Sequence, residues 1–264
     1  MDYKLHIAGI RGTRPVCGVD YQEYGGDTSC YAIICGTYAL VLDCGTGVSR
    51  LKEYLHKCTK VDIILTHLHY DHVIGLLDFD ICTPNIKPNL YGTFSKWGED
   101  GERGTFAGNN RYWPAAIPYV GPYDMKRKQV YTFGDGNVEL KVILFKSNHP
   151  NETSIIQVEV QGKKILLMSD YEHGVELDAD IKEEYELLIY DGMYTDEEYK
   201  ICKGYGHSTI SEGIKLAKEW NVKHLGITHV NPNKTDAMLA KMDRELQEEL
   251  PNGCILKAGM IFDL

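Results

Sequence analysis

A dense group of polar side chains, residues 66–72 with the sequence THLHYDH, constrains this chain more than any other stretch. The group contains three imidazoles and one carboxylate, and these belong to His67, His69, Asp71 and His72. It comes directly after the apolar run VDIIL at residues 61–65. A buried strand that ends in this way delivers several ligands to one point at the carboxyl edge of a sheet. Imidazole and carboxylate are the usual ligands of catalytic zinc and related divalent ions, so the stretch predicts a metal centre.

The spacing HxHxDH divides these ligands into two pairs. In an extended loop His67 and His69 face the same way and can serve one ion, and the turn that follows brings Asp71 and His72 round to a second ion. Asp71 and His72 also precede the apolar run at residues 73–77, which predicts a short helix whose N-terminus favours an anion. The alternative is a chance run of polar residues on a solvated loop. A dense motif between a predicted strand and a predicted helix argues against that alternative.

Length and charge limit the remaining possibilities. The chain has 264 residues without a linker rich in Pro, Gly or Ser, so we expect a single domain over residues 1–264. The net charge of −10 argues against binding of long nucleic acid, but it leaves room for a small phosphate ester held by metal ions. The first residues lack a basic region followed by an apolar stretch, which favours a soluble, cytoplasmic protein without membrane contact. The eight cysteines are scattered without a CxxC pair, which favours reduced, buried thiols.

Strands and turns alternate ahead of the histidine-rich motif. The patterns predict strands at residues 4–8, 31–35 and 38–42, followed by a helix at residues 48–57. Asp43 comes directly after the third strand. Its carboxylate either hydrogen-bonds a ligand histidine from behind or caps a simple turn, and both interpretations stay open.

After the motif, residues from about 80 to 129 lack regular periodicity and are rich in Gly, Pro, Asn and aromatic residues. Loops of this length are commonly lids, binding loops or interfaces. This insertion therefore covers the metal centre, packs on a partner subunit, or is a structural excursion that its aromatic side chains attach to the body. Its cations are expected to be solvated, with one or two available to a phosphate: Arg103, Arg111, Lys126, Arg127 and Lys128.

Regular patterns resume in the second half of the chain. Strands are predicted at residues 138–145, 153–160, 164–168, 187–191, 224–229 and 255–264, with helices at 210–220 and 235–250. Three further ligand candidates follow the ends of such strands: His149, Asp170 and His229. Taken alone, each is an ordinary loop or cap residue. The other histidines lack such placement and are treated as ordinary: His6, His56, His173 and His224.

The HxHxDH motif, with these three candidates following it in order, resembles the metallo-β-lactamase-fold hydrolases over nearly the whole chain. The resemblance implies an α/β fold of the αββα sandwich type, with two mostly β layers inside, helices outside, and ligands on loops at one edge. It also implies two divalent ions per chain, with zinc first and manganese or iron as alternatives. One ion would be held by His67, His69 and His149, the other by Asp71, His72 and His229, and Asp170 would bridge them.

A second motif, GHST at residues 206–209, resembles the ribonuclease Z branch of that superfamily and its related phosphodiesterases. The resemblance implies that His207 contacts the scissile phosphate or protonates the leaving oxygen, a task that suits an imidazole near neutral pH. Asp191 stands where that branch has an acidic residue that orients this histidine. Gly206, Ser208 and Thr209 are predicted to contact the substrate. The alternative is that His207 only caps its helix together with Ser208, because the motif is short.

The chain also departs from ribonuclease Z. That family has a long basic arm between the third histidine and the bridging aspartate, and here two strands and a hairpin occupy this interval. Residues 230–232 are VNP, where the family has a sequence that contains Ser. Without that arm, the chain resembles the small phosphodiesterases of the branch, among them the anti-Pycsar phosphodiesterases and the cyclic-phosphate enzymes of phosphonate metabolism.

The implied function is hydrolysis of a cyclic nucleotide or a similar small phosphodiester by attack of a metal-bound hydroxide. Asp71 and Asp170 would hold the ions and the hydroxide, and His207 would protonate the leaving ribose oxygen. Aromatic residues of the 80–129 loop are candidates for stacking on the base. The first alternative is a ribonuclease Z-type RNA 3′-processing nuclease, and the second is a non-catalytic nucleotide binder on the same fold. Relatives are commonly dimers, so a homodimer is a further expectation.

Overall fold

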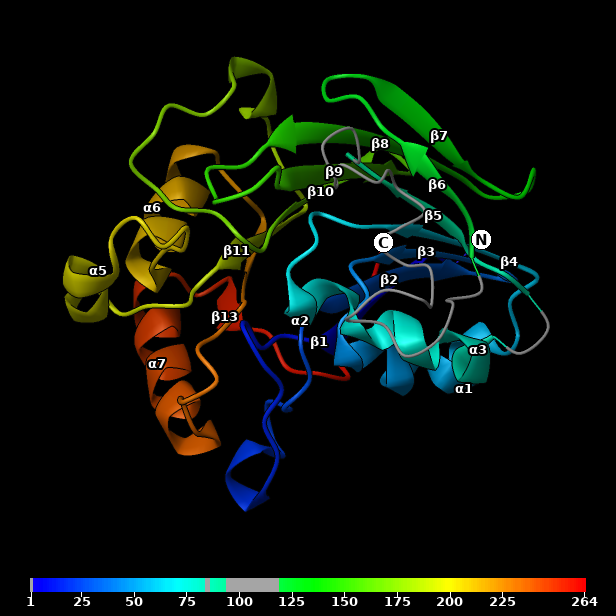
Figure 1. Cartoon of the computed structure of the whole chain (residues 1–264). Helices are drawn as coiled ribbons and strands as arrows, with labels where there is room; N and C mark the ends of the chain where they lie inside the picture. The colour runs from blue at the N-terminus through cyan, green and yellow to red at the C-terminus, as the bar shows by residue number, and fades with distance from the viewer. Residues whose placement is uncertain (1, 84–85, 94–118) are drawn as a thin grey trace.

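The computed structural model describes residues 2–83, 86–93 and 119–264. The apolar runs of the sequence form strands that are covered on both sides, because every residue of β2 and β3 is buried. Two sheets of seven strands face each other, and helices lie on the outer sides of the pair (Figure 1). The expected αββα sandwich is thereby confirmed.

The first sheet combines antiparallel and parallel strands. Its order is β14 (Ile261–Asp263), β1 (Lys4–Gly9), β2 (Cys30–Cys35), β3 (Tyr38–Leu42), β4 (Lys60–Ile64), β5 (Asn89–Gly92) and β6 (Val120–Asp124). Strands β14 to β3 pair antiparallel, and β3 to β6 pair parallel. The carboxyl ends of β3, β4 and β5 therefore meet at one edge of the sheet.

The second sheet repeats this division. Its order is β13 (Gly253–Ile255), β12 (His224–Thr228), β11 (Leu187–Asp191), β10 (Lys163–Met168), β9 (Ser154–Val160), β8 (Glu139–Lys146) and β7 (Val130–Gly134). Strands β10 to β13 pair parallel, and β7 to β10 pair antiparallel. Strands β9 and β10 are joined by a tight turn at Gln161 and Gly162, which both have a positive φ, of 51° and 77°.

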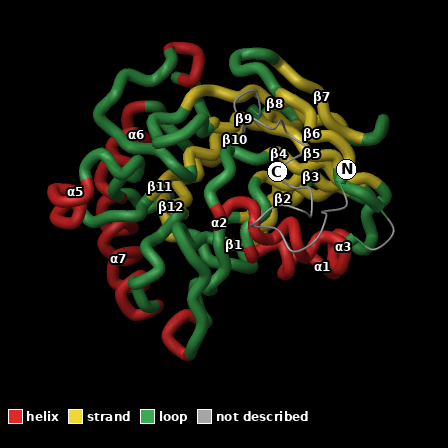
Figure 2. Tube along the Cα trace, viewed as in Figure 1, coloured by secondary structure: helices red, strands yellow, loops and turns green. Residues whose placement is uncertain are grey.

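The helices form two groups on opposite sides of the sheets (Figure 2). On the first sheet lie α1 (Lys52–Leu55), α2 (Tyr70–Val73) and α3 (Phe79–Cys82), with 3-10 helices at Thr46–Leu51 and Ile74–Asp78. On the second sheet lie α6 (Ile210–Glu219) and α7 (Asp236–Glu249), and α5 (Asp196–Cys202) lies further out. Short 3-10 helices also occur at Val19–Tyr21 and Ala179–Ile181. One apolar core fills the space between the sheets and continues to α6 and α7, and a second core lies under α1 and α3.

The structure corrects three sequence-based expectations. Residues 80–129 are not loop throughout, because β5 and β6 lie within this range; β6 contains Gly121 and Pro122, which an edge strand tolerates. Residues 255–264 do not form one strand: the chain turns at Gly259 (φ 97°), so that β13 and β14 join different sheets. Strand β7, at the edge of the second sheet, was not predicted. The aromatic segments around Trp97 and Trp113, expected to form a lid or a subunit contact, lie outside the described residues.

The cysteines were expected to be reduced and buried. All eight cysteines are free thiols, and five of them are buried, whereas Cys17 is exposed and Cys202 and Cys254 are partly buried. Within the described ranges, no helix combines the length and the apolar character that crossing a membrane requires.

Candidate metal centre

The loop after β4 brings four ligand candidates to the carboxyl edge of the first sheet. His69 is the last extended residue before α2, and Asp71 and His72 lie in the first turn of that helix. Both Asp71 and His72 are buried, although they are polar. The backbone N–H of Thr13, in the loop after β1, donates to Asp71 Oδ2 at 2.6 Å. Such burial of charged groups is stable only where partners compensate it.

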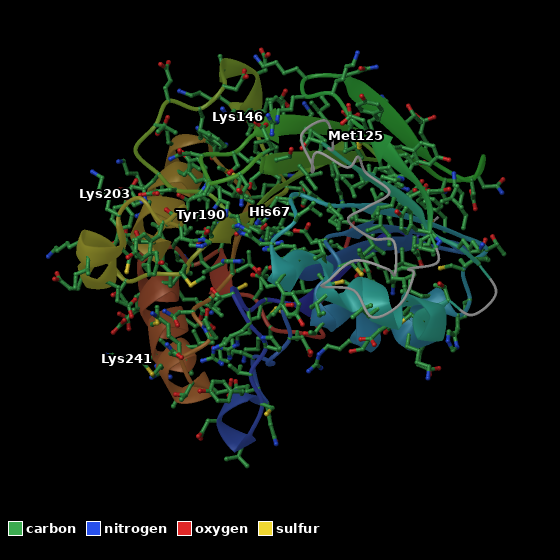
Figure 3. The ribbon with its side chains drawn as sticks, viewed as in Figure 1. His67, Met125, Lys146, Tyr190, Lys203 and Lys241 are labelled. Carbon is green, nitrogen blue, oxygen red and sulfur yellow. The ribbon has the colours of Figure 1, made fainter. Side chains whose placement is uncertain are left out.

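The second sheet adds three candidates, one from each of three strand ends. His149 lies between β8 and β9, Asp170 lies two residues after β10, and His229 follows β12 directly. Strands β10, β11 and β12 run parallel, so their carboxyl ends meet at one edge. Figure 3 shows His67 in the interior of the molecule, whereas Lys203 and Lys241 project at its periphery. The edge of each sheet thus contributes to a common centre.

These residues gather into two groups whose ligand atoms lie within 4.8 Å of one another. The first group is His67, His69, His149 and Asp170, and the second is Asp71, His72 and His229. The division is the one that the HxHxDH spacing predicts. A third combination, Asp170 with His207 and His229, satisfies the same distance.

Asp170 lies between the two groups with one oxygen toward each. Its Oδ2 is 3.8 Å from His67 Nε2 and 3.7 Å from His149 Nε2. Its Oδ1 is 3.0 Å from His72 Nε2 and 3.4 Å from His229 Nε2. A carboxylate in this position can bind one ion through each oxygen.

The chemistry of these ligand atoms fits divalent metal ions. His67 Nε2 is buried and has no hydrogen-bond partner, which is costly unless an ion binds it. Burial lowers the pKa of His67, His69 and His149, which favours the neutral imidazole that a metal requires. Burial by itself raises the pKa of Asp71 and Asp170, but the neighbouring imidazoles outweigh it and hold both values below the usual range.

Asp43 supports the metal-binding loop through hydrogen bonds. Of the two interpretations that the sequence left open, a carboxylate that holds a ligand histidine or a simple turn cap, the structure shows the first. Asp43 Oδ2 accepts from His72 Nδ1 at 2.8 Å, and its Oδ1 accepts from the Thr66 backbone N–H at 2.8 Å. The Thr66 hydroxyl in turn lies 3.0 Å from His67 Nδ1. A single buried carboxylate therefore orients one histidine of each group. Burial lowers the pKa of His72, but the surrounding carboxylates outweigh it and raise the value well above normal, which reflects a surplus of negative charge.

Other residues that hold the ligands were not identified from the sequence. Asn151 places its side-chain amide nitrogen 2.6 Å from His69 Nε2, and its φ of 74° is unusual for a residue other than Gly. Gly12 lies under His229: a Cβ there would come within 2.4 Å of the imidazole. The sequence signals for these positions are the glycine-containing loop after the first strand and the Pro-Asn pair at residues 150–151, directly after His149.

His207 lies beside the centre, and the carboxylate of Asp191 contacts its ring. Its Nδ1 donates to Asp191 Oδ2 at 2.8 Å, and that carboxylate is completely buried. The ring stacks on His229 with the centroids 4.8 Å apart, and Nε2 is left for the centre. Burial by itself lowers the pKa of His207, but the charge and hydrogen bond of Asp191 outweigh it and raise the value to about 9.

The other residues of the GHST motif make hydrogen bonds within the protein. Gly206 accepts from His149 Nδ1 through its carbonyl at 2.8 Å. The Ser208 hydroxyl is buried and lies 2.8 Å from both Tyr190 Oη and His173 Nδ1. Thr209 caps α6 by accepting from the Glu212 N–H. The expectation that Ser208 and Thr209 contact the substrate finds no support in these contacts, because both side chains are engaged within the protein.

Two of the described cations in the 80–129 range form ion pairs with carboxylates. Arg127 Nη1 lies 2.9 Å from Glu152, and Lys128 Nζ lies 2.5 Å from Asp178. These two cations, which were expected to be solvated, thus form ion pairs; that one or two of the five cations meet a phosphate stays a prediction. Arg103 and Arg111 lie outside the described ranges.

The αββα sandwich and this ligand set define a metal-binding hydrolase. A family model described as the "Beta-lactamase superfamily domain" matches residues 38–230, well over half of the chain. The chain belongs to the β-lactamase superfamily, in its metallo-β-lactamase-fold form.

Comparison with solved structures confirms the fold. The metallo-β-lactamase-fold protein YhfI from Bacillus subtilis superposes with a TM-score of 0.75 at 20% identity, covering 100% of this chain and 99% of that one. A diphosphatase from the PhnP family gives 0.68 at 16% identity and covers 100% and 98%. Among curated proteins, ribonuclease Z of Enterococcus faecalis is 24% identical over 124 residues, 47% of this chain and 39% of that protein. The match thus spans less than half of that relative.

Proposed function

We propose that this protein is a metal-dependent phosphodiesterase that hydrolyses a cyclic nucleotide or a similar small phosphodiester. The observation that carries the proposal is the His207–Asp191 pair directly beside two groups of metal ligands. A site that only binds metal ions does not need an imidazole oriented in this way. The pair supplies what metal ligands alone lack, which is a group able to give a proton to a leaving oxygen.

The metal ligands position the reaction. His67, His69 and His149 would hold one ion, Asp71, His72 and His229 the other, and Asp170 both. Two ions so held supply a water molecule of lowered pKa and polarise the phosphoryl oxygens. Zinc is our first choice for both, because imidazole and carboxylate ligands suit it, with manganese or iron as alternatives.

The protein's own proton donor is His207. Asp191 accepts from Nδ1, which fixes the orientation of the ring and directs Nε2 toward the centre. Stacking on His229 limits rotation of the imidazole further. A proton on Nε2 would therefore be in place for the oxygen that leaves phosphorus, and Asp191 stabilises the charged form that carries it.

The small size of the proposed substrate rests on the segment between His149 and Asp170. Strands β9 and β10 and their tight turn occupy this interval, so no arm extends from it. The net charge of −10 also opposes binding of a long polyanion. Both features favour a compact diester over RNA.

The test is turnover by the metal-loaded protein of bis(p-nitrophenyl) phosphate and of a panel of cyclic mononucleotides. Release of a nucleoside monophosphate would support the proposal. His207→Ala should lower this rate by about 10²–10⁴-fold while both ions stay bound. Asp71→Ala should lower the rate too, but, unlike His207→Ala, it should lose an ion. Wild-type protein that binds two ions without hydrolysing any diester would contradict the proposal and favour a non-catalytic nucleotide binder.

A second candidate function is RNA 3′-processing, because the curated relative from Enterococcus faecalis described above is a ribonuclease Z. Precursor tRNA belongs in the same panel for this reason. Trimmed tRNA beside intact cyclic nucleotides would move the assignment to this candidate. We propose the small diester first, because the chain lacks an arm between β9 and β10.

A further inference from the structure

Glu172 is a buried carboxylate close to the metal centre that no step of the proposed mechanism uses. Only 8% of its surface is exposed. Its Oε1 accepts from the Gly204 N–H at 2.6 Å and from the Tyr199 hydroxyl at 2.9 Å. Its Oε2 accepts from the Gly206 N–H at 2.9 Å. Both oxygens therefore bind the segment that leads into His207.

The backbone of Glu172 is attached to a different segment. Its N–H donates to the Asn148 carbonyl at 2.9 Å, and the Asn148 side-chain amide donates to the Glu172 carbonyl at 2.6 Å. Asn148 immediately precedes the ligand His149, and Glu172 follows the ligand Asp170 by two residues. One residue thus joins three loops of the centre: 148–149, 170–172 and 204–207.

The 204–207 loop depends on these hydrogen bonds, because little else holds its first residues. Gly204 and Gly206 have no side chains and a positive φ, of 92° and 91°, and the Tyr205 side chain is 64% exposed. Gly206 in turn accepts from His149 Nδ1, so a shift of Gly206 moves a metal ligand. His207, the next residue, moves with it.

We infer that Glu172 is a positioning residue that places the ligand His149 and the proton donor His207 together. It does so by accepting from backbone N–H groups of the loop between them. Glu172 is not itself a ligand in this scheme, because both of its oxygens are already engaged with Gly204, Gly206 and Tyr199. The part that concerns His207 rests on the proposed function, whereas the part that concerns His149 does not.

The decisive variant is Glu172→Gln. The amide keeps the shape of the side chain, but its NH₂ group would face one of the two backbone N–H donors and cannot accept from it. We expect affinity for the ion held by His149 to fall by about 10–100-fold, as for other residues that orient metal ligands. The ion held by His72 and His229 should bind as in the wild type. With an active diester, kcat should fall about tenfold or more with little change in KM, because the loss concerns the transition state.

Two controls separate positioning from general damage. Glu186 directly precedes β11, away from the centre, and its carboxylate pairs with Lys223. Glu186→Gln is the same exchange and should leave the affinities for both ions unchanged. Thermal unfolding of the metal-free proteins measures any loss of stability. If Glu172→Gln does not fold, Glu172→Asp replaces it, because the shorter side chain keeps the charge but cannot reach both Gly204 and Gly206.

Two measurements test the inference. Competition with a chelator gives the affinity for each of the two ions separately, and the visible spectrum of the cobalt-substituted protein reports on the metal ligands. Selective weakening of the His149 ion in the variant supports the inference. Affinities and cobalt spectrum that match those of Glu186→Gln overturn it. If the wild-type protein hydrolyses no phosphodiester, only the proposed function is contradicted, because the metal titration still tests the role of Glu172.

Discussion

The two sheets build the metal centre in opposite ways. The first sheet supplies four ligand candidates from one short loop, residues 67–72 after β4. The second sheet supplies His149, Asp170 and His229, each from a different strand end. Each ligand group nevertheless draws on both sheets, because His149 completes the first group and His229 the second. The centre therefore exists only where the two halves of the chain are packed together.

The support of the ligands differs in the same way. Asp43, a single carboxylate, orients His72 directly and His67 through a threonine. In the second half, backbone geometry replaces that carboxylate: Gly206 accepts from His149, and the buried Nδ1 of His229 has no partner. The loop is supported from the neighbouring strand of its own sheet, whereas His149 is supported by a loop 57 residues further along the chain. Variants can test this contrast.

The largest effect should come from Asp170→Asn, because Asp170 places one carboxylate oxygen toward each ligand group. Loss of its charge should weaken both ions and cost about 4 kcal/mol of transition-state stabilisation, which is about a thousandfold in rate. Metal content and turnover of bis(p-nitrophenyl) phosphate measure this. Asp178→Asn, at a carboxylate paired with Lys128, is the matched control. If the variant loses only one ion, Asp170 does not bridge.

Removal of the metal ions should lower the melting temperature, since each ion links the two halves of the molecule. A ligand present at a hundred times its Kd contributes about 2.7 kcal/mol. For a chain of this size, that shifts the melting temperature by about 5–10 °C per ion. Thermal unfolding with and without a chelator measures the shift. His207→Ala should show the same shift, because its metal ligands are intact; an unchanged melting temperature in the wild type would contradict the link.

A smaller effect, confined to the second half, is expected for Gly206→Ala. A Cβ at Gly206 would lie 2.3 Å from His149 Nδ1, whereas a Cβ at Gly204 would meet nothing within 4 Å. Both glycines have nearly the same positive φ, so Gly204→Ala carries the backbone strain alone, about 1–2 kcal/mol. Gly206→Ala should weaken the His149 ion by about 10–100-fold in addition. Equal metal affinities in the two variants, measured by chelator competition, would show that the contact is unimportant.

The smallest effect is expected for Asp43→Asn, which tests the support of the loop. The φ of Asp43 is 57°, a conformation that Asn tolerates, so the backbone should not change. Weaker support of His72 should lower affinity for its ion by about tenfold. Asp62→Asn is the control, because this buried carboxylate binds Tyr38 and Asn89 away from the centre and should affect stability only. A drop in metal affinity for the control would mean that loss of stability explains both.

The sequence predicted most of the interior fold and missed parts of its edges. Strands β2, β3 and β4 were readable because continuous apolar runs identify strands that are buried on both faces. Strands β5, β6 and β7 were missed; β6 and β7 are edge strands, which need neither a full apolar pattern nor the absence of Pro, and β5 has only four residues. The split of residues 255–264 between two sheets has no local signal, because the partners of β13 and β14 are distant in sequence.

The sequence alone determined the metal-ligating chemistry, since HxHxDH places four donors within six residues and local geometry keeps them together. Only the tertiary structure decided what surrounds them. It made Asp43 a support of the metal-binding loop rather than a turn cap, engaged the Ser208 hydroxyl with Tyr190, and brought Glu172 under the loop of His207. The physical reason is that each of these hydrogen bonds joins segments that only the folded sheets bring together, which no short stretch of residues encodes.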